Sequence, residues 1–311
     1  MYDVTDAAFR AIIAKYGKPD VMFTEFVSAE GLNNIQGRAR LAHHLKFSDA
    51  ERPIVAQIFG SHPEQFAPAA EFIAGLGFDG IDINMGCPDK NIIKQGSCAA
   101  LFGTPHLAQE IIRETRRGAS GLPISVKIRI GDTKIDWQNW IAALLAEEPA
   151  AISIHLRTRK EMSKVPAHWE VMPEIVSFIR NRAGNSAPLI LGNGDVLSIE
   201  GAERKILESG CDGVMIGKGV FGNPWLFARR KKEPAAAERI AVLLEHTKLF
   251  QELLATEKNF EIMKKHYKAY VSGFGGAAAL RAELMQAKNS AQVETILGNN
   301  GLTVPLPAAI V

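Results

Sequence analysis

Short apolar runs alternate along the first two thirds of the chain with longer stretches in which apolar residues recur at helical spacing. The short runs predict buried strands, because they are rich in β-branched residues and end at glycine, proline or asparagine. The longer stretches predict amphipathic helices between the strands. Seven strands are predicted, at residues 21–24, 54–59, 78–83, 122–128, 151–155, 188–191 and 213–216.

Helix start signals support this alternation. The residues that we expect to cap or open the helices are Thr5, Ser61 with Glu64, Thr104 with Pro105, Asp136 and Ser198. Strand and helix repeat about every 25 to 35 residues, which is typical of consecutive right-handed βαβ units. The predicted fold is therefore α/β, a (β/α)8 TIM barrel. A doubly wound sheet is the alternative, which is weakened because no G-x-G-x-x-G follows any strand.

The pattern changes after Trp225. The basic run at residues 229–232 is followed by Pro234, and beyond it apolar residues continue at helical spacing. We therefore predict two domains, a barrel over residues 1–233 and a small helical domain over residues 234–311.

Composition limits the classes of function. The net charge of the 311-residue chain is +2, so nucleic-acid binding would have to come from local basic clusters. Its three cysteines, Cys87, Cys98 and Cys211, are widely spaced and form no C-x-x-C pair, so neither a disulfide framework nor a metal site is predicted. This usage fits the reducing cytoplasm. The chain shows no secretory leader and no apolar run long enough to span a membrane.

The run from Gly80 to Pro88 takes a strand directly into a turn that ends on Cys87. Pro88 has no N–H to give to a sheet, so the cysteine is expected at the carboxyl end of a strand, where α/β folds keep their chemistry. Asn84 places an amide at the same strand end. A cysteine by itself is more often a small buried hydrophobe than an acid or a nucleophile.

The other predicted strands also end in residues that can do chemistry. These residues are Gln57, Lys127 with Arg129, His155 with Arg157 and Arg159, Asn193 to Asp195, and Gly217 to Gly219. Two glycine turns after the last two strands favour a phosphate site, because glycine lets backbone N–H groups approach the ligand. An inward lysine in an apolar barrel would need an anionic ligand. Together these features suit a phosphorylated cofactor.

The order and spacing of these segments resemble those of the tRNA-dihydrouridine synthase family over nearly the whole chain. The matching motifs are Val4 to Asp6, Phe9-Arg10, Thr24-Glu25, Gln57, Asn84 to Pro88, Val126 to Arg129, His155, Arg157 to Arg159, Asn193 to Asp195, Met215 to Gly217, Gly222 to Trp225, and Lys264 to His266 with Tyr270. Leu156, Cys98 and His168 depart from the glycine, glycine and aspartate that are usual at these places.

The resemblance implies an FMN enzyme that reduces D-loop uridines of tRNA to 5,6-dihydrouridine, with NADPH as the reductant. By similarity, the flavin ring is held by Gln57, Lys127 and His155. The flavin phosphate is surrounded by Asn193, Gly194, Asp195, Gly217 and Lys218. Cys87 donates the proton, and the expected substrate contacts are Asn84, Arg157, Arg159, Lys264, Lys265 and Lys268. The last three share one side of a helix, and a solvated lysine face is the alternative for them.

Two other functions are possible for this pattern. One is an FMN barrel that acts on a free pyrimidine, and the other is an RNA-binding protein in which the barrel is catalytically silent. A tRNA-dihydrouridine synthase and an FMN barrel that acts on a free pyrimidine both imply no metal and no stable protein partner. The resemblance also implies that Met1 to Asp6 matches the middle of an Ala-Pro-Met turn. We therefore expect the first barrel strand to be missing from this chain.

Overall fold

The structure is a computed structural model that describes residues 1–230 and 233–302. The chain divides into two compact units. The sheet unit comprises Val21–Ala42 and Arg52–Lys218, and the helical unit comprises Met1–Asp20, His43–Glu51 and the chain from Gly219 onward. The sequence placed the boundary at residue 233 alone. Three segments of the predicted barrel domain, 1–20, 43–51 and the described residues 219–230, group instead with the C-terminal helices.

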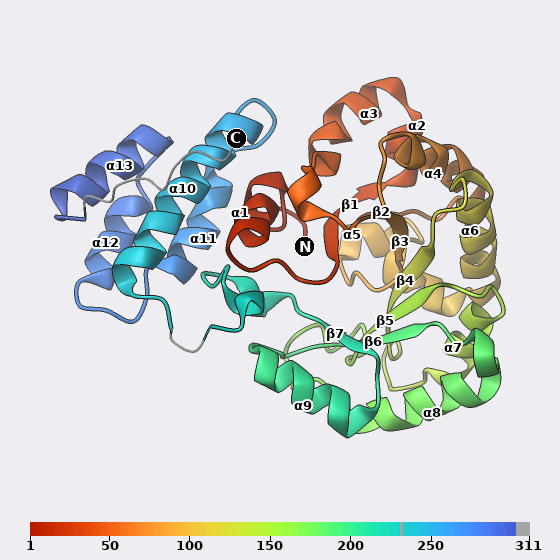
Figure 1. The fold of residues 1–311 in the computed structure, drawn as a ribbon. Helices are drawn as coiled ribbons and strands as arrows, with labels where there is room; N and C mark the ends of the chain where they lie inside the picture. The colour runs from red at the N-terminus through yellow and green to blue at the C-terminus, as the bar shows by residue number, and fades with distance from the viewer. Residues whose placement is uncertain (231–232, 303–311) are drawn as a thin grey trace. The chain divides into compact units, whose positions relative to one another are not determined.

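The sheet unit contains seven parallel strands, each paired with the next one in the sequence (Figure 1). They are β1 (Met22–Ser28), β2 (Ile54–Phe59), β3 (Gly80–Asn84), β4 (Ile124–Arg129), β5 (Ala151–His155), β6 (Leu189–Asn193) and β7 (Gly213–Met215). All seven predicted strands are therefore confirmed. Sequential parallel pairing with helical crossovers is the barrel-type α/β architecture that the alternation predicted, rather than a doubly wound sheet.

Helices connect the strands of the sheet unit. They are α2 (Ala29–Asn33), α3 (Ile35–Leu41), α4 (Phe66–Gly75), α5 (Lys90–Lys94), α6 (Pro105–Gly118), α7 (Gln138–Leu145), α8 (Met172–Ala183) and α9 (Ile199–Ser209). Helix α4 packs on α6, α6 on α7, α7 on α8 and α8 on α9, so these helices form one layer along the sheet (Figure 1). The short helices α2, α3 and α5 were not predicted, because two turns or fewer carry too little periodicity to read.

Three of the predicted helix starts are wrong in detail. Asp136 does not cap α7, because Trp137 is the residue before its first turn and no side chain caps it. The side chain of Asp6, not Thr5, caps α1 (Ala7–Gly17) by accepting from Phe9 N at 3.0 Å. Ser61 forms no capping box, because its Oγ donates instead to Gln95 O at 2.7 Å. A single 3-10 turn then precedes α4. The cap at Ser198 is confirmed, since its Oγ accepts from the backbone N–H of Gly201 at 3.0 Å.

The helical unit confirms the predicted C-terminal helices. Its further helices are α10 (Ala236–Leu254), α11 (Met263–Tyr270), α12 (Ala277–Leu284) and α13 (Ser290–Asn299). One apolar cluster of buried side chains joins them, and Ala8 and Ile12 of α1 belong to the same cluster. This shared core explains why the N-terminal helix groups with this unit. Within the two described stretches, no helix is both long and apolar enough to cross a membrane.

Two histidines lie fully buried in the helical unit. His266 of α11 contacts His246 of α10, with ring centroids 4.6 Å apart, and the Phe9 and Phe221 rings flank it at 4.6 and 5.6 Å. Neither ring nitrogen of His266 has a hydrogen-bond partner among the described residues. Burial lowers the pKa of His266 to about 3, and repulsion by Lys265 and Lys258 adds to this. Burial also lowers the pKa of His246 well below its ordinary value.

These histidines predict a loss of stability in mild acid. A group whose folded pKa is depressed stabilises the fold above its unfolded pKa, near 6.5, and loses that contribution as the pH falls below it. We expect each histidine to lower the free energy of unfolding by about 1.4 kcal/mol for each pH unit below 6.5. Thermal unfolding between pH 7 and 5 measures this. His266→Phe should flatten the dependence, whereas exposed His106→Gln should not; equal slopes in all three proteins would contradict the prediction.

Candidate active site

A fully buried carboxylate, Asp82, joins three strands of the sheet unit. Gln57 Nε2 of β2 donates to Asp82 Oδ2 at 2.7 Å, and Ser125 Oγ of β4 donates to Asp82 Oδ1 at 2.6 Å. Burial raises the pKa of Asp82, against these hydrogen bonds and the positive charge of Lys127. Asp82 was not among the predicted site residues. The sequence could have indicated it, because Asp82 lies two positions before Asn84 and a strand places such residues on one face.

Asn84 connects this network to the cysteine turn. Its Nδ2 donates to Gln57 Oε1 at 3.0 Å. Its Oδ1 accepts from the backbone N–H groups of Gly86 and Cys87, at 3.1 and 3.0 Å. A single side chain therefore fixes the turn after β3, and the position of Cys87 is tied to a buried residue on the neighbouring strand.

Cys87 is partly exposed in this turn, and the buried Cys98 lies close to it, since Ala99 N donates to Cys87 O at 3.3 Å. A hydrogen bond from buried Cys98 is the largest cause that lowers the pKa of Cys87 to about 7, and Arg129 also lowers it, while burial opposes the change. Burial raises the pKa of Cys98 well above its ordinary value. Cys98 has φ of +55°, in the left-handed region that favours glycine. This conformation fits the glycine that is usual at its place in the family it resembles.

Arg129, at the end of β4, holds the cysteine turn from the other side. Its Nε donates to Gly86 O at 2.7 Å. Its Nη1 donates to Thr158 O at 3.1 Å and to Met162 O at 3.0 Å, in the loop after β5. The sequence placed Arg129 at a strand end without giving it a role. The structure makes it the link between the Cys87 turn and the 158–162 loop.

Replacing Arg129 with methionine should therefore change both the chemistry and the position of Cys87. We expect the pKa of the thiol to rise and the rate of the reaction that Cys87 serves to fall by about 10²-fold, because the turn is misplaced. The pH dependence of Cys87 alkylation measures the first effect. Arg129→Lys keeps the charge but loses the forked hydrogen bonds, so it should restore the thiol pKa and not the rate. An unchanged alkylation profile in Arg129→Met would refute this role.

Lys127, also on β4, is a half-buried cation. Its Nζ donates to Asn193 Oδ1 at 3.2 Å, and Asn193 Nδ2 donates to Met215 O at 2.7 Å. Burial, then repulsion by Arg129, lowers the pKa of Lys127 to about 8, while Asp82 opposes the shift. The ends of β4, β6 and β7 are thus connected. Among the described residues, Asn193 Oδ1 is the one acceptor for three ammonium hydrogens, which leaves donors for a ligand.

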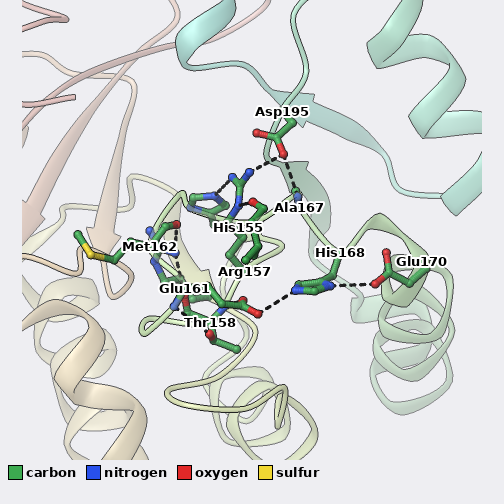
Figure 2. A network of polar contacts seen from close by, with 11 residues as sticks. His155, Arg157, Thr158, Glu161, Met162, Ala167, His168, Glu170 and Asp195 are labelled. Atoms are coloured by element: carbon green, nitrogen blue, oxygen red, sulfur yellow. Dashed lines mark hydrogen bonds and ion pairs between the residues drawn. The ribbon is translucent and has the colours of Figure 1, made fainter.

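Figure 2 shows Arg157 lying between His155 and Asp195. Its Nη1 lies 3.1 Å from His155 Nε2, its Nη2 forms an ion pair with the Asp195 carboxylate, and its Nε donates to Val165 O at 2.7 Å. Burial and the cations around it lower the pKa of His155 to about 2, so the ring is neutral. These contacts occupy the buried guanidinium. The substrate contact predicted for Arg157 stays a prediction.

The loop that follows β5 is braced by a histidine between two carboxylates (Figure 2). His168 Nε2 lies 3.0 Å from Glu161 Oε1, and His168 Nδ1 lies 2.9 Å from Glu170 Oε1. The other oxygen of Glu161 accepts from Thr158 N at 2.8 Å. His168, which departs from the usual aspartate, therefore holds the same loop that Arg129 contacts.

The two predicted phosphate turns follow β6 and β7. Gly194 has φ of +133°, and a Cβ added to it would lie 2.6 Å from the Cβ of Ala167. Its carbonyl accepts from Trp169 Nε1 at 2.8 Å. Lys218 is exposed beside Gly217, and its charge lowers the pKa of both His155 and Asp195 after the larger effects of burial and of Arg157 respectively. Lys218, in the turn after β7, is therefore within electrostatic reach of Asp195, in the turn after β6.

The remaining predicted substrate residues either form ion pairs of their own or are exposed. Arg159 forms an ion pair with Asp132. Lys264 belongs to the helical unit and pairs with Glu261 at 2.6 Å. Lys265 and Lys268 are exposed on the same helix, α11. The roles of these four cations as substrate contacts stay predictions.

The chain is similar to enzymes of one family. A family model described as "Dihydrouridine synthase (Dus)" matches residues 1–302. A "Probable tRNA-dihydrouridine synthase" of Staphylococcus aureus (strain COL) is 40% identical over 301 residues, covering 96% of this chain and 90% of that protein. A "Probable tRNA-dihydrouridine synthase 2" of Bacillus subtilis (strain 168) is 40% identical over 299 residues, covering 96% and 91%.

Solved structures share the fold at low sequence identity. An old yellow enzyme homologue from Zymomonas mobilis has a TM-score of 0.51 and 15% identity, covering 73% of this chain and 83% of that chain. Histamine dehydrogenase from Rhizobium sp. 4-9 has a TM-score of 0.54 and 13% identity, covering 79% and 47%. At these identities the matches show a common barrel architecture.

Proposed function

This chain belongs to the dihydrouridine synthase family, and on that basis we propose that it reduces uridine in tRNA to 5,6-dihydrouridine. The observation that supports this reaction most is the Cys87 thiol, held at a strand end by Asn84 with a pKa of about 7. A general acid works best when its pKa is near the operating pH. D-loop uridines are the proposed targets.

The residues fit FMN as the cofactor. Lys127 is a half-buried cation with ammonium hydrogens to spare. Ser153 Oγ on the neighbouring β5 is buried without a hydrogen-bond partner in the described chain. A flavin ring is a planar group with several acceptors, so it would satisfy both. Gln57 and the neutral His155 complete the proposed ring site. The glycine turns at Gly194 and Gly217, with Asn193, Asp195 and Lys218, would hold the phosphate.

The proposed reaction divides between the cofactor and the protein. Bound FMN, reduced by NADPH, supplies the hydride that goes to C6 of uracil. Negative charge then develops on the uracil ring, and Cys87 donates its proton to C5. Asn84 and Arg129 keep the turn of Cys87 in place through their contacts to Gly86. The Lys127 ammonium would stabilise this developing negative charge.

A stacked uracil is out of reach of such a site, so the target base has to be extruded from the tRNA. Extrusion costs a few kcal/mol, which phosphate contacts elsewhere on the protein would offset. The helical unit, with exposed Lys265 and Lys268, is the proposed source of those contacts. The same reaction places the enzyme in the cytoplasm, where tRNA and NADPH are available.

Two measurements separate this proposal from its alternatives. The purified protein should show a flavin absorption band, and mass spectrometry of the released cofactor should identify FMN. With NADPH, the protein should reduce tRNA transcripts and leave free uridine unchanged. Turnover of free uridine would favour a pyrimidine reductase, and a colourless protein that binds tRNA would favour the silent RNA-binding reading. Comparing NADPH with NADH under the same conditions tests the reductant.

The α11 lysines can be tested through the salt dependence of tRNA binding. Replacing Lys264, Lys265 and Lys268 with alanine should weaken binding and reduce the slope of log K against log salt by about two to three, because each phosphate contact contributes somewhat under one unit. Flavin reduction by NADPH should not change. The control is Lys248→Ala, since Lys248 is already paired with Glu294 at 2.7 Å. An unchanged slope in the triple variant would assign these lysines to a solvated face.

A further inference from the structure

Cys87 and Cys98 lie close together, although the two residues belong to different parts of the loop after β3, and each thiol shifts the pKa of the other. The short helix α5 lies between them in the sequence. A backbone hydrogen bond from Ala99 N to Cys87 O, at 3.3 Å, holds the two segments side by side. The third cysteine, Cys211, is separate, and its Sγ donates to Gly213 O at 3.2 Å. Of the three cysteines, which all lie in the described chain, Cys87 and Cys98 are therefore the two that lie close together.

The two thiols differ in ways that suit oxidation in two steps. Cys87 is partly exposed and is the more acidic, so its thiolate is available to a small oxidant at neutral pH. Cys98 is fully buried and keeps its proton, so the same oxidant does not reach it first. A reactive thiolate beside a protected second thiol is the arrangement found where a disulfide forms by resolution of an oxidised cysteine.

We propose that Cys87 and Cys98 form a reversible disulfide when the protein meets a hydroperoxide. In the first step the Cys87 thiolate attacks the peroxide oxygen, the O–O bond breaks, and with one proton water leaves and Cys87 sulfenic acid remains. In the second step the Cys98 sulfur attacks the sulfenic sulfur, the S–O bond breaks, and a second water leaves as the S–S bond forms. The two thiols lose two electrons to the peroxide, and an added dithiol returns them.

This disulfide would control the activity, and that consequence rests on the proposed function. Cys87 in the oxidised form has no proton to donate, so uridine reduction should fall by about 10²-fold or more. Cys98 would at the same time protect Cys87, because a disulfide is reducible whereas sulfinic acid is not. Asn84 and Arg129 hold the turn through backbone groups of residues 86 and 87, so these contacts do not depend on the redox state.

The full-length protein should be treated with hydrogen peroxide, alkylated with iodoacetamide and digested with trypsin without reduction. Cleavage separates the two cysteines into peptides 47–90 and 95–113. We expect these peptides to be joined, with two hydrogens fewer than their sum, and tRNA reduction to be lost and then restored by dithiothreitol. Cys87 recovered as sulfinic acid beside an alkylated Cys98, with no joined peptides, would overturn the proposal.

Two variants serve as controls. Cys98→Gly is tolerated at φ of +55° and removes the second thiol, so peroxide should convert Cys87 to sulfinic acid that dithiothreitol does not repair. Cys211→Ala keeps the pair and should give the same joined peptides as the wild type. Joined peptides that persist in Cys98→Gly would contradict the assignment. If the untreated protein reduces no tRNA, the proposed function fails, whereas the peptide masses still decide the disulfide.

Discussion

Replacing Cys87 with alanine should lower the rate of tRNA reduction by about 10² to 10⁴, the usual contribution of a general acid. The variant should still bind FMN and accept electrons from NADPH. The hydrogen bonds that fix the turn come from the backbone N–H groups of Gly86 and Cys87, so alanine preserves them. The substitution therefore removes the thiol proton while leaving the proposed flavin residues Gln57 and Lys127 in place.

The measurement is a single-turnover assay of dihydrouridine formation alongside the rate of flavin reduction. Cys211→Ala is the control for losing a thiol elsewhere, because Cys211 is buried and bonded to a local carbonyl. We expect Cys87→Ala to lose tRNA reduction alone. Wild-type rates in Cys87→Ala together with a defect in a Cys98 variant would assign the proton donor to Cys98.

Replacing Glu51 with alanine should destabilise the helical unit by about 3 to 5 kcal/mol, the cost of removing one partner of a buried ion pair. Arg10 Nε lies 2.7 Å from Glu51 Oε2, and the two side chains are 2% and 1% exposed. The pair joins α1 to the 43–51 segment, which are both parts of that unit. Without Glu51 the guanidinium stays buried with backbone carbonyls as its remaining acceptors, Thr5 O among them.

Urea unfolding of the wild type and the variant measures this difference in the free energy of unfolding. The matched control is Glu294→Ala, which breaks the Lys248–Glu294 pair, whose side chains are 32% and 53% exposed. Exposed pairs contribute about 0 to 1 kcal/mol, so this control should change little. Similar losses of unfolding free energy in Glu51→Ala and Glu294→Ala would contradict this prediction. They would show that burial does not determine how much the Arg10–Glu51 pair contributes to stability.

The strands could be predicted from the sequence because each one carries its own signal. The run from Gly80 to Asn84 alternates apolar and polar residues and ends at a turn, and the structure places β3 over those residues. Helix α5 was missed because it has five residues, and its cap, the Asp89 side chain, looks like any loop aspartate. Local pattern fixes a strand or a long helix and does not fix a single turn.

The site was predicted in part, for a related reason. Cys87, Asn84 and Lys127 stand at strand ends and could be selected one by one. The contacts that give these residues their chemistry join distant parts of the sequence. The periodicity of apolar residues does not predict such contacts. The Cys87–Cys98 hydrogen bond and the Arg129–Gly86 contact are both of this kind. The grouping of the 1–20 and 43–51 segments with the C-terminal helices was missed for the same reason.

The central claim is that this chain reduces uridine within tRNA. The most direct test incubates the purified protein with FMN, NADPH and an unmodified tRNA transcript, and then measures dihydrouridine by mass spectrometry of the digested RNA. We predict a gain of two hydrogens on D-loop uridines that requires NADPH and is nearly absent with Cys87→Ala. A wild-type protein that binds FMN, oxidises NADPH and binds the transcript, yet leaves every uridine at its original mass, would contradict the account.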